Sequence, residues 1–162
     1  MDVATDTCIL INLAVVGRLD LLKTIPPFLF HAATEVLDEI KDLDQRAAID
    51  EAIAAGHLDE IKLDQAGELS LFVNFNATLG KGESACLALA KARGWTIATD
   101  ESKDPKWKRM IAGGGFAIIN TPGILLAAIH NGKLTVVAAD EIKAKLEQRR
   151  FKMKFDSFGS LV

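Results

Sequence analysis

Acidic residues that follow two predicted strands are the first candidates for chemistry in this chain. The apolar stretch 2–5 is followed by Asp6, and the apolar stretch 95–99 is followed by Asp100. Parallel strands present their carboxyl ends at one edge of a sheet, where open α/β folds bind ligands, so neighbouring strands would bring the two carboxylates together. The structural alternative is that Asp6 caps the following helix and Asp100 caps a turn at 101–102, because such side chains accept hydrogen bonds from free N–H groups.

Further acidic residues lie in two predicted helices. Glu83 is in the first turn of a helix predicted over 83–93, and Glu35 and Glu39 lie one turn apart in a helix predicted over 34–41. Helix N-termini gather at the edge where parallel strands end, so acids from four segments can converge there. For Glu83 the alternative is a structural role, since the helix dipole alone favours an acid in the first turn. We expect at least one of Glu35 and Glu39 to be an ordinary solvated helix residue.

Four carboxylates at one edge would need a cation between them. Two carboxylates about 5 Å apart at an effective dielectric constant of about 20 repel by roughly 3 kcal/mol, so ionising all four is costly unless some are protonated or a cation intervenes. Oxygen ligands without a His/Cys set favour Mg²⁺ or Mn²⁺ over zinc. Such a site suits phosphodiester hydrolysis, because the metal activates water and offsets charge developing on the phosphate.

The rest of the chain predicts the elements that position these acids. Runs that suit short strands lie at 28–31, 95–100 and 116–120, with an edge strand or extended link at 57–63. Helices are predicted over 9–16, 20–23, 34–41, 44–55, 65–75, 83–93, 106–112, 122–130 and 140–151. We expect Asp104 and Thr121 to cap the helices that follow them, and the tail to 162 to dock or to fray. Strands alternating with helices favour a three-layer α/β/α fold with a mostly parallel central sheet.

Length and composition place the chain in a broad class. With 162 residues, 49% hydrophobic and 25% charged, it matches one globular domain over 1–162. No apolar run approaches the roughly 20 residues of a membrane-spanning helix, and the N-terminus lacks a signal-peptide pattern, so we expect a cytoplasmic protein without a membrane partner. Cys8 and Cys86 lack metal-ligand spacing and are predicted to be buried free thiols.

Charge does not decide the partner. The net charge of −3 argues against a generally basic nucleic-acid binder, yet it leaves room for a local basic patch. Basic residues do cluster near the C-terminus, at Lys143, Lys145, Arg149, Arg150, Lys152 and Lys154. We interpret this cluster as a solvated face, with a binding site as the alternative.

Several other functional motifs are excluded because the order or spacing of their residues does not match this sequence. Residues 80–84 lack the Gly-Lys-Ser/Thr order of a phosphate-binding loop. A haloacid-dehalogenase-like phosphatase needs a second acid two residues after its nucleophile, and Cys8 occupies that position after Asp6. The histidines show neither zinc spacing nor a Ser/His/Asp pattern and are expected in the core or on the surface; they are His31, His57 and His130.

Four motifs, taken together in order and spacing, resemble a PIN domain. They occupy residues 6–13, 36–40, 79–85 and 99–101, and the resemblance extends from residue 6 to about residue 126. Residues 80–83 and 120–124 look closest to a less characterised PIN branch that is often suspected to contain toxins. The resemblance implies a PIN-like α/β/α fold and a Mg²⁺- or Mn²⁺-dependent ribonuclease, as in the VapC-type toxins of toxin–antitoxin pairs.

The resemblance also implies a set of site residues and partners. The acids that it assigns to catalysis and metal binding are Asp6, Glu39, Glu83 and Asp100, with Thr7 and Asn12 as supporting polar residues. Glu35 competes with Glu39 for the second position, and the acids at 101 and 104 have no assigned role. The partners implied are an RNA substrate, with local Lys and Arg residues holding its phosphates, an antitoxin protein, and a second copy of the chain in a homo-oligomer.

Two functions from other classes remain as alternatives. One is a non-catalytic PIN-like module that binds RNA or protein. The other is a receiver-like phosphoacceptor domain, which would need a loop Lys and a Thr around the acids in another order.

Overall fold

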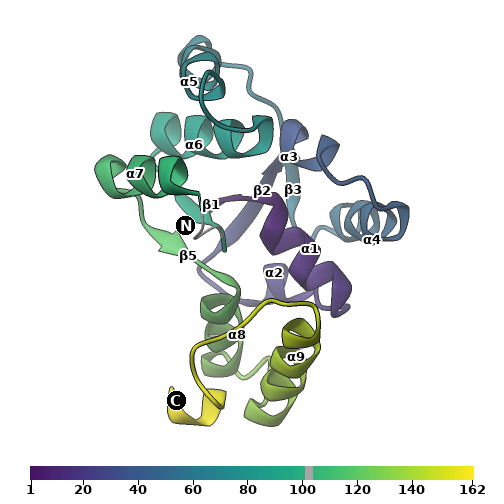
Figure 1. Ribbon diagram of the computed structural model, residues 1–162. Coiled ribbons are helices and arrows are strands. Elements are labelled where there is room, and N and C mark those ends of the chain that lie inside the picture. Colours follow the sequence, from purple (N-terminus) through teal and green to yellow (C-terminus); the bar gives the residue numbers. More distant parts are fainter. Residues whose placement is uncertain (101–103) are drawn as a thin grey trace.

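A computed structural model, which describes residues 1–100 and 104–162, shows an α/β fold built on a parallel sheet (Figure 1). The strands are β1 (Asp2–Thr5), β2 (Leu29–Ala33), β3 (Asp59–Ile61), β4 (Thr96–Ala98) and β5 (Ile118–Ile119). The helices are α1 (Thr7–Val15), α2 (Leu21–Thr24), α3 (Thr34–Asp38), α4 (Leu43–Ala54), α5 (Ala66–Asn76), α6 (Lys81–Arg93), α7 (Pro105–Gly114), α8 (Thr121–His130), α9 (Val136–Gln148) and the 3₁₀ helix η1 (Phe158–Ser160). The turn predicted at 101–102 lies outside the described residues.

Strand β1 lies in the middle of the sheet. Within the described residues the strand order is β3-β2-β1-β4-β5, and each neighbouring pair is parallel. Ala4 pairs with His31 on one side and with Ile97 on the other. Because β1 and β4 are parallel neighbours, the chain leaves both of them at the same edge of the sheet. The condition under which Asp6 and Asp100 come together, that their strands are neighbours, is therefore met.

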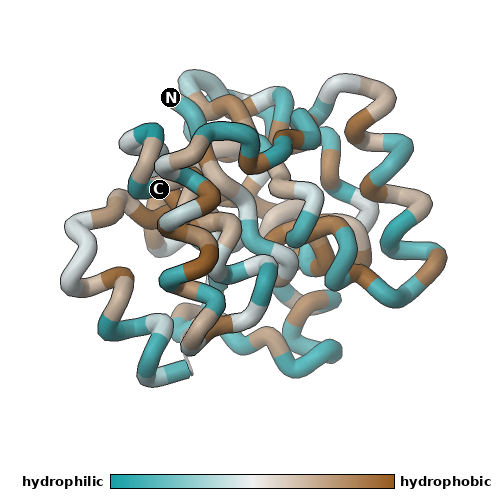
Figure 2. The backbone as a smooth tube through the Cα atoms, turned by 90° about the horizontal axis from the view of Figure 1, so that it is seen from above, coloured by the Kyte–Doolittle hydropathy of each residue, from teal (hydrophilic) through white to brown (hydrophobic). Residues whose placement is uncertain are grey.

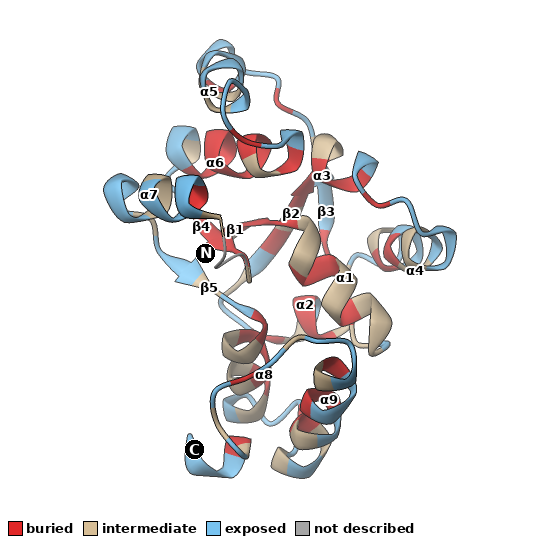
Figure 3. Ribbon diagram, in the orientation of Figure 1, coloured by how far each residue is buried: buried red, intermediate tan, exposed pale blue. Residues whose placement is uncertain are grey.

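Helices cover both faces of this sheet, which gives the three-layer arrangement that the sequence predicts (Figure 1). Helix α6 packs on β1, β2 and β4 and is itself covered by α3 and α5. Its residues from Ser84 to Ala90 are all buried, and most are small, so the helix can approach the sheet closely (Figure 3). Helix α4 packs on α1, α8 packs on α1 and α2, and α9 packs on α8.

The hydrophobic core is continuous across the layers. Hydrophobic residues gather towards the middle of the molecule, and hydrophilic ones lie mostly along its rim (Figure 2). The C-terminal tail docks on this core, because Phe158 is fully buried and Asp140 accepts hydrogen bonds from Ser157 Oγ at 2.6 Å and Phe158 N at 2.9 Å. In the part of the chain that the structure describes, no helix combines the length and the apolar character needed to span a bilayer.

Two helix predictions near the acids were wrong. The helix predicted over 34–41 ends at Asp38, because its last carbonyls are satisfied from outside the helix. Arg46 Nη1 donates to Leu37 O at 2.8 Å and Lys41 Nζ donates to Asp38 O at 2.5 Å. Thr121 does not cap α8. The side chain of Asn120 accepts from Gly123 N at 2.9 Å instead, which leaves the Thr121 hydroxyl available for another partner.

Two other boundaries also differ from the prediction. The strand predicted over 116–120 as buried is the two-residue edge strand β5, in which Ile118 is 44% exposed. An edge strand has a neighbour on one side only, so its apolar sequence did not ensure burial. Helix α9 begins at Val136 rather than at 140, since Thr135 caps it by accepting from Ala138 N at 3.1 Å.

Candidate active site

Asp6 lies at the N-terminus of α1 with both carboxylate oxygens engaged. Oδ1 accepts from Thr7 N at 2.8 Å, and Oδ2 accepts from Thr99 Oγ1 at 2.9 Å and from Cys8 Sγ at 3.0 Å. Burial raises the pKa of Asp6, the three hydrogen bonds lower it, and the charge of Glu39 raises it again, with a net increase over the ordinary value. Asp6 therefore caps the helix, as the structural alternative requires, and also contributes a nearly buried oxygen at the sheet edge.

Asp100 occupies a comparable position at the end of β4. Oδ1 accepts from Thr121 N at 2.8 Å, and Oδ2 accepts from Asn12 Nδ2 at 2.9 Å and from the Thr121 hydroxyl. Burial raises the pKa of Asp100 above its ordinary value, although the hydrogen bonds from Thr121 and Asn12 oppose this increase. Thr121 is thus a hydrogen-bond partner of Asp100 in the candidate site, whereas the sequence predicts that it caps α8.

Cys8 connects the two aspartates. Its Sγ donates to Asp6 Oδ2 and accepts from Asp100 N at 3.2 Å. Burial and the negative charge of Asp6 raise the pKa of the Cys8 thiol, so the thiol stays protonated and acts as a donor. Cys8 and Cys86 are both free, as predicted, and Cys86 is buried whereas Cys8 is half-buried.

Glu39 and Glu83 meet at the N-terminus of α6. Glu39 Oε1 accepts from Gly82 N at 2.7 Å, and its Oε2 accepts from Thr7 Oγ1 at 3.2 Å, which links it to the residue next to Asp6. Glu83 Oε2 accepts from Gly80 N at 3.1 Å, so Glu83 does cap its own helix. A Cβ on Gly82 would overlap the Glu39 carboxylate, so this close approach depends on the glycine.

Glu35, the alternative to Glu39, lies in the first turn of α3. It lines a pocket of about 500 Å³ together with Glu39 and Lys81, and its Oε2 is buried without a hydrogen-bond partner within the described residues. The contacts with Thr7 and Gly82 belong to Glu39. Asp104 caps α7 by accepting from Lys106 N at 2.7 Å, which confirms its predicted capping role.

The acids at this edge are of the type that binds a hard cation, but their side chains are not gathered closely around one point. Carboxylate oxygens are the ligands that Mg²⁺ prefers, and neither Asp6 nor Asp100 forms an ion pair within residues 1–100 and 104–162. Over the same residues, however, no group of three or more His, Cys, Asp or Glu side chains is close enough to hold a metal ion. The carboxylates are instead bonded to hydroxyl, amide, thiol and backbone N–H donors.

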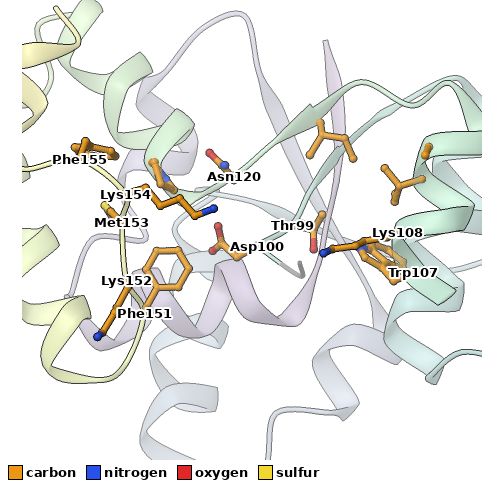
Figure 4. A pocket seen from close by; sticks show the side chains of 14 residues that line it. Thr99, Asp100, Trp107, Lys108, Asn120, Phe151, Lys152, Met153, Lys154 and Phe155 are labelled. Carbon is orange, nitrogen blue, oxygen red and sulfur yellow. The ribbon is translucent and has the colours of Figure 1, made fainter. Parts of the chain in front are cut away.

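A groove of about 650 Å³ opens beside Asp100. Its walls are α7, which contributes Trp107 and Lys108, and the segment 151–155 (Figure 4). A pocket of about 330 Å³ adjoins it at Asp100 and is lined by Cys8, Asn12, Arg149, Arg150 and others. The sequence interpretation placed these basic residues on a solvated face. The signal that was available is the alternation of basic and apolar residues over 150–155.

A solved structure shares this fold. A chain in the crystal structure of VapBC2 from Rickettsia felis bound to a DNA fragment from their promoter superposes with a TM-score of 0.52. It is 16% identical, and the superposition covers 74% of this chain and 98% of that chain. At this identity the likeness concerns the fold alone. No curated protein sequence matches the chain.

The sequence also matches a family model over nearly its whole length. The match is to the model DUF3368, described as a PIN domain, and it covers residues 2–157. The chain therefore belongs to the PIN-domain family.

Proposed function

We propose that the protein is a Mg²⁺- or Mn²⁺-dependent endoribonuclease that hydrolyses RNA phosphodiester bonds beside Asp6 and Asp100. The observation that carries this proposal is the pair of largely buried carboxylates at the ends of β1 and β4, both with a raised pKa. Their hydrogen-bond partners are uncharged groups, which do not neutralise two negative charges. A cation bound between the strand ends would remove the energetic penalty of ionising both residues.

The residues assigned to the metal are Asp6 and Asp100, with Glu39 and Glu83 beside them. When bound, the cation would supply an activated water and neutralise charge developing on the phosphate. Thr99 and Cys8 orient the Asp6 carboxylate, and Asn12 and Thr121 orient the carboxylate of Asp100. Such outer hydrogen bonds fix the direction of the ligand lone pairs and so control affinity for a metal.

The test compares RNA cleavage by the wild type and by Asp6→Asn and Asp100→Asn. Labelled single-stranded RNA is incubated with each protein in Mg²⁺, Mn²⁺ or EDTA and is resolved on a denaturing gel. Loss of outer-shell contacts alone costs about 10- to 100-fold, so we expect loss of a direct ligand to reduce the rate by more than about 100-fold. Asp44→Asn, at the exposed start of α4, is the matched control and should retain the wild-type rate.

Wild-type cleavage rates in both aspartate variants would contradict the proposal. RNA binding without cleavage in either metal would instead favour the non-catalytic PIN-like module. Circular dichroism and melting curves of each variant separate loss of chemistry from loss of fold.

We further propose that the biological role is that of a toxin neutralised by an antitoxin protein. The support is the resemblance of the four motifs to a PIN domain, the kind of domain found in VapC-type toxins, together with the family match. Expression of the wild-type chain should arrest growth, Asp100→Asn should not, and a small protein encoded beside it should relieve the arrest. We also expect a homo-oligomer, which light scattering of the purified chain would detect.

A further inference from the structure

Helix α9 ends with an arginine in a backbone conformation that favours glycine. Arg150 has φ of 70°, its N–H donates to Glu147 O at 3.0 Å, and Phe151 N donates to Leu146 O at 3.1 Å. These two bonds form a Schellman motif, in which the left-handed position is usually glycine. Among the described residues Arg150 is the only non-glycine residue with positive φ; the other positions are Gly17, Gly56, Gly94, Gly115 and Gly132.

This conformation is unfavourable for any residue with a Cβ. The Cβ approaches the following carbonyl oxygen, which glycine avoids, so an arginine here makes the end of α9 less stable than a glycine would. Local strain of this kind is found where a side chain has a function that keeps it in place. The environment of Arg150 indicates what that function is.

Arg150 is the second residue of a basic segment, residues 149–154, that borders the candidate active site. It lines the same pocket as Asp100, Cys8 and Asn12. The segment has four positive and no negative side chains, although the whole chain has a net charge of −3. Such a local excess of positive charge, next to an acidic site, favours binding of a phosphate-bearing ligand over a merely solvated surface.

Burial along the segment alternates in step with residue type. Phe151 is half-buried and Met153 is buried, whereas Lys152 and Lys154 are exposed. The apolar side chains therefore attach the segment to the protein, and the cations remain available to a ligand. In residues 1–100 and 104–162 none of Arg150, Lys152 and Lys154 forms an ion pair.

The opposite wall of the groove also carries a cation. Figure 4 shows Lys108 extending from α7 towards Thr99, and Lys154 extending from the basic segment towards Asp100. Asp100 thus lies between cations of two walls. A polynucleotide that crosses the groove would place consecutive phosphates near these cations and one phosphodiester near Asp100.

We propose that the basic segment is the phosphate-binding wall of the RNA cleft, and that Arg150 is a phosphate-binding residue retained there at the expense of the stability of α9. This inference rests on the proposed function for the identity of the ligand. It does not depend on cleavage, since phosphate binding by Arg150 precedes any chemistry. Arg150→Gly should therefore weaken RNA binding while it stabilises the fold.

The test is fluorescence anisotropy with a labelled 20-nucleotide single-stranded RNA in EDTA, where no cleavage occurs, at a series of KCl concentrations. Losing one charged contact should weaken binding about ten-fold. It should also reduce the slope of log Kd against log salt by about 0.7, the value for one phosphate contact on a single strand. In the same variant the Tm should rise by about 2–4 °C, because glycine relieves the strain.

Two further variants complete the design. Arg150→Lys keeps both the charge and the strained conformation, so its salt slope and Tm should stay near those of the wild type. Lys145→Ala removes an exposed cation of α9 that lines neither cavity, and it should leave binding unchanged within about two-fold.

The possible outcomes separate this inference from the proposed function. Wild-type affinity and salt slope in Arg150→Gly, or a lowered Tm, would overturn the inference even if the wild type cleaves RNA. Arg150-dependent binding by a wild type that cleaves nothing in Mg²⁺ or Mn²⁺ would support the inference and contradict the nuclease. Equal losses in Lys145→Ala and Arg150→Gly would overturn the assignment of a specific wall.

Discussion

The acids at this edge of the sheet form two pairs in contrasting environments. The strand-end pair, Asp6 and Asp100, follows β1 and β4, is largely withdrawn from solvent, and has raised pKa values because burial penalises the charged form. The helix-end pair, Glu39 and Glu83, is bonded to backbone N–H groups at the N-terminus of α6, where the helix dipole also favours negative charge. Asp6 and Asp100 also accept from backbone N–H groups, those of Thr7 and Thr121, at the starts of α1 and α8. The difference between the pairs is therefore the burial that raises the pKa of Asp6 and of Asp100.

This contrast indicates a division of roles. A cation gains most where burial penalises the ionised carboxylates, so metal affinity should depend mainly on the strand-end pair. The helix-end pair should act on the shape of the site, because Glu39 connects α6 to Thr7 beside Asp6. Three predictions address this division.

The largest effect is expected from metal binding to the strand-end pair. A ligand at 100 times its Kd stabilises the native state by about 2.7 kcal/mol, which for a chain of this size raises the Tm by about 5–10 °C. Adding Mn²⁺ should produce such a shift in the wild type and little of it in Asp100→Asn. Differential scanning fluorimetry across a Mn²⁺ titration measures both.

Glu39→Gln is the informative comparison in that titration. It should keep most of the Mn²⁺ shift if the helix-end pair is secondary. A loss as complete as in Asp100→Asn would show that the two pairs contribute equally and would remove the distinction drawn above.

A smaller effect is expected from displacing Glu39 without changing its charge. In Gly82→Ala the new Cβ overlaps the Glu39 carboxylate, so Glu39 must move from Thr7. We expect RNA cleavage to fall about ten-fold, which corresponds to about 1.4 kcal/mol in the activation barrier. Gly80→Ala is the matched control, because its Cβ would lie at ordinary contact distances of 3.6 Å from Glu83 and 3.7 Å from Glu39. Equal rates in both variants would contradict a role for the position of Glu39.

The smallest effect concerns pH and the stability of the fold. Because the pKa of Asp6 is higher in the folded chain than in the unfolded chain, ionisation destabilises the fold as pH rises from about 3.8 through the raised value. Asp6→Asn removes this contribution. Without metal, the free energy of unfolding of the variant minus that of the wild type should therefore increase between pH 4 and pH 7.

Urea unfolding at each pH in EDTA measures this difference. A relative stability that decreases over that range would mean that the Asp6 carboxylate is stabilised by its hydrogen bonds more than it is penalised by burial.

The strand ends could be predicted from the sequence because both follow short apolar runs and parallel pairing brings such ends together. That rule placed Asp6 and Asp100 at one edge of the sheet, and the strand order of the structure makes their strands neighbours. The partners of these acids could not be predicted in the same way. Thr121 has the sequence of a helix cap, and only the capture of Gly123 N by Asn120 directs its N–H and hydroxyl to Asp100.

The choice between Glu35 and Glu39 also depended on distant contacts. Both residues fit the same helical pattern, but Glu35 lies in the first turn of α3 whereas Glu39 is its C-cap residue. Near that end Leu37 O accepts from Arg46 of α4, a contact that no local pattern connects with α3. The basic segment was interpreted as a solvated face for a related reason, since the sequence does not show that its charges lie next to Asp100.

The hydrogen bonds that Asp140 accepts from Ser157 and Phe158 have a consequence for the order in which the molecule is made. These bonds hold Phe158, which follows the basic segment in the chain, against α9. The acids of the candidate site come from earlier in the chain, at residues 6, 39, 83 and 100. A nascent chain that has emerged only as far as α8 already contains every one of these acids, but it lacks the wall and the residue that fastens it. The groove therefore becomes complete only once residues 149–158 have been made, after the sheet and the acidic edge have been able to form.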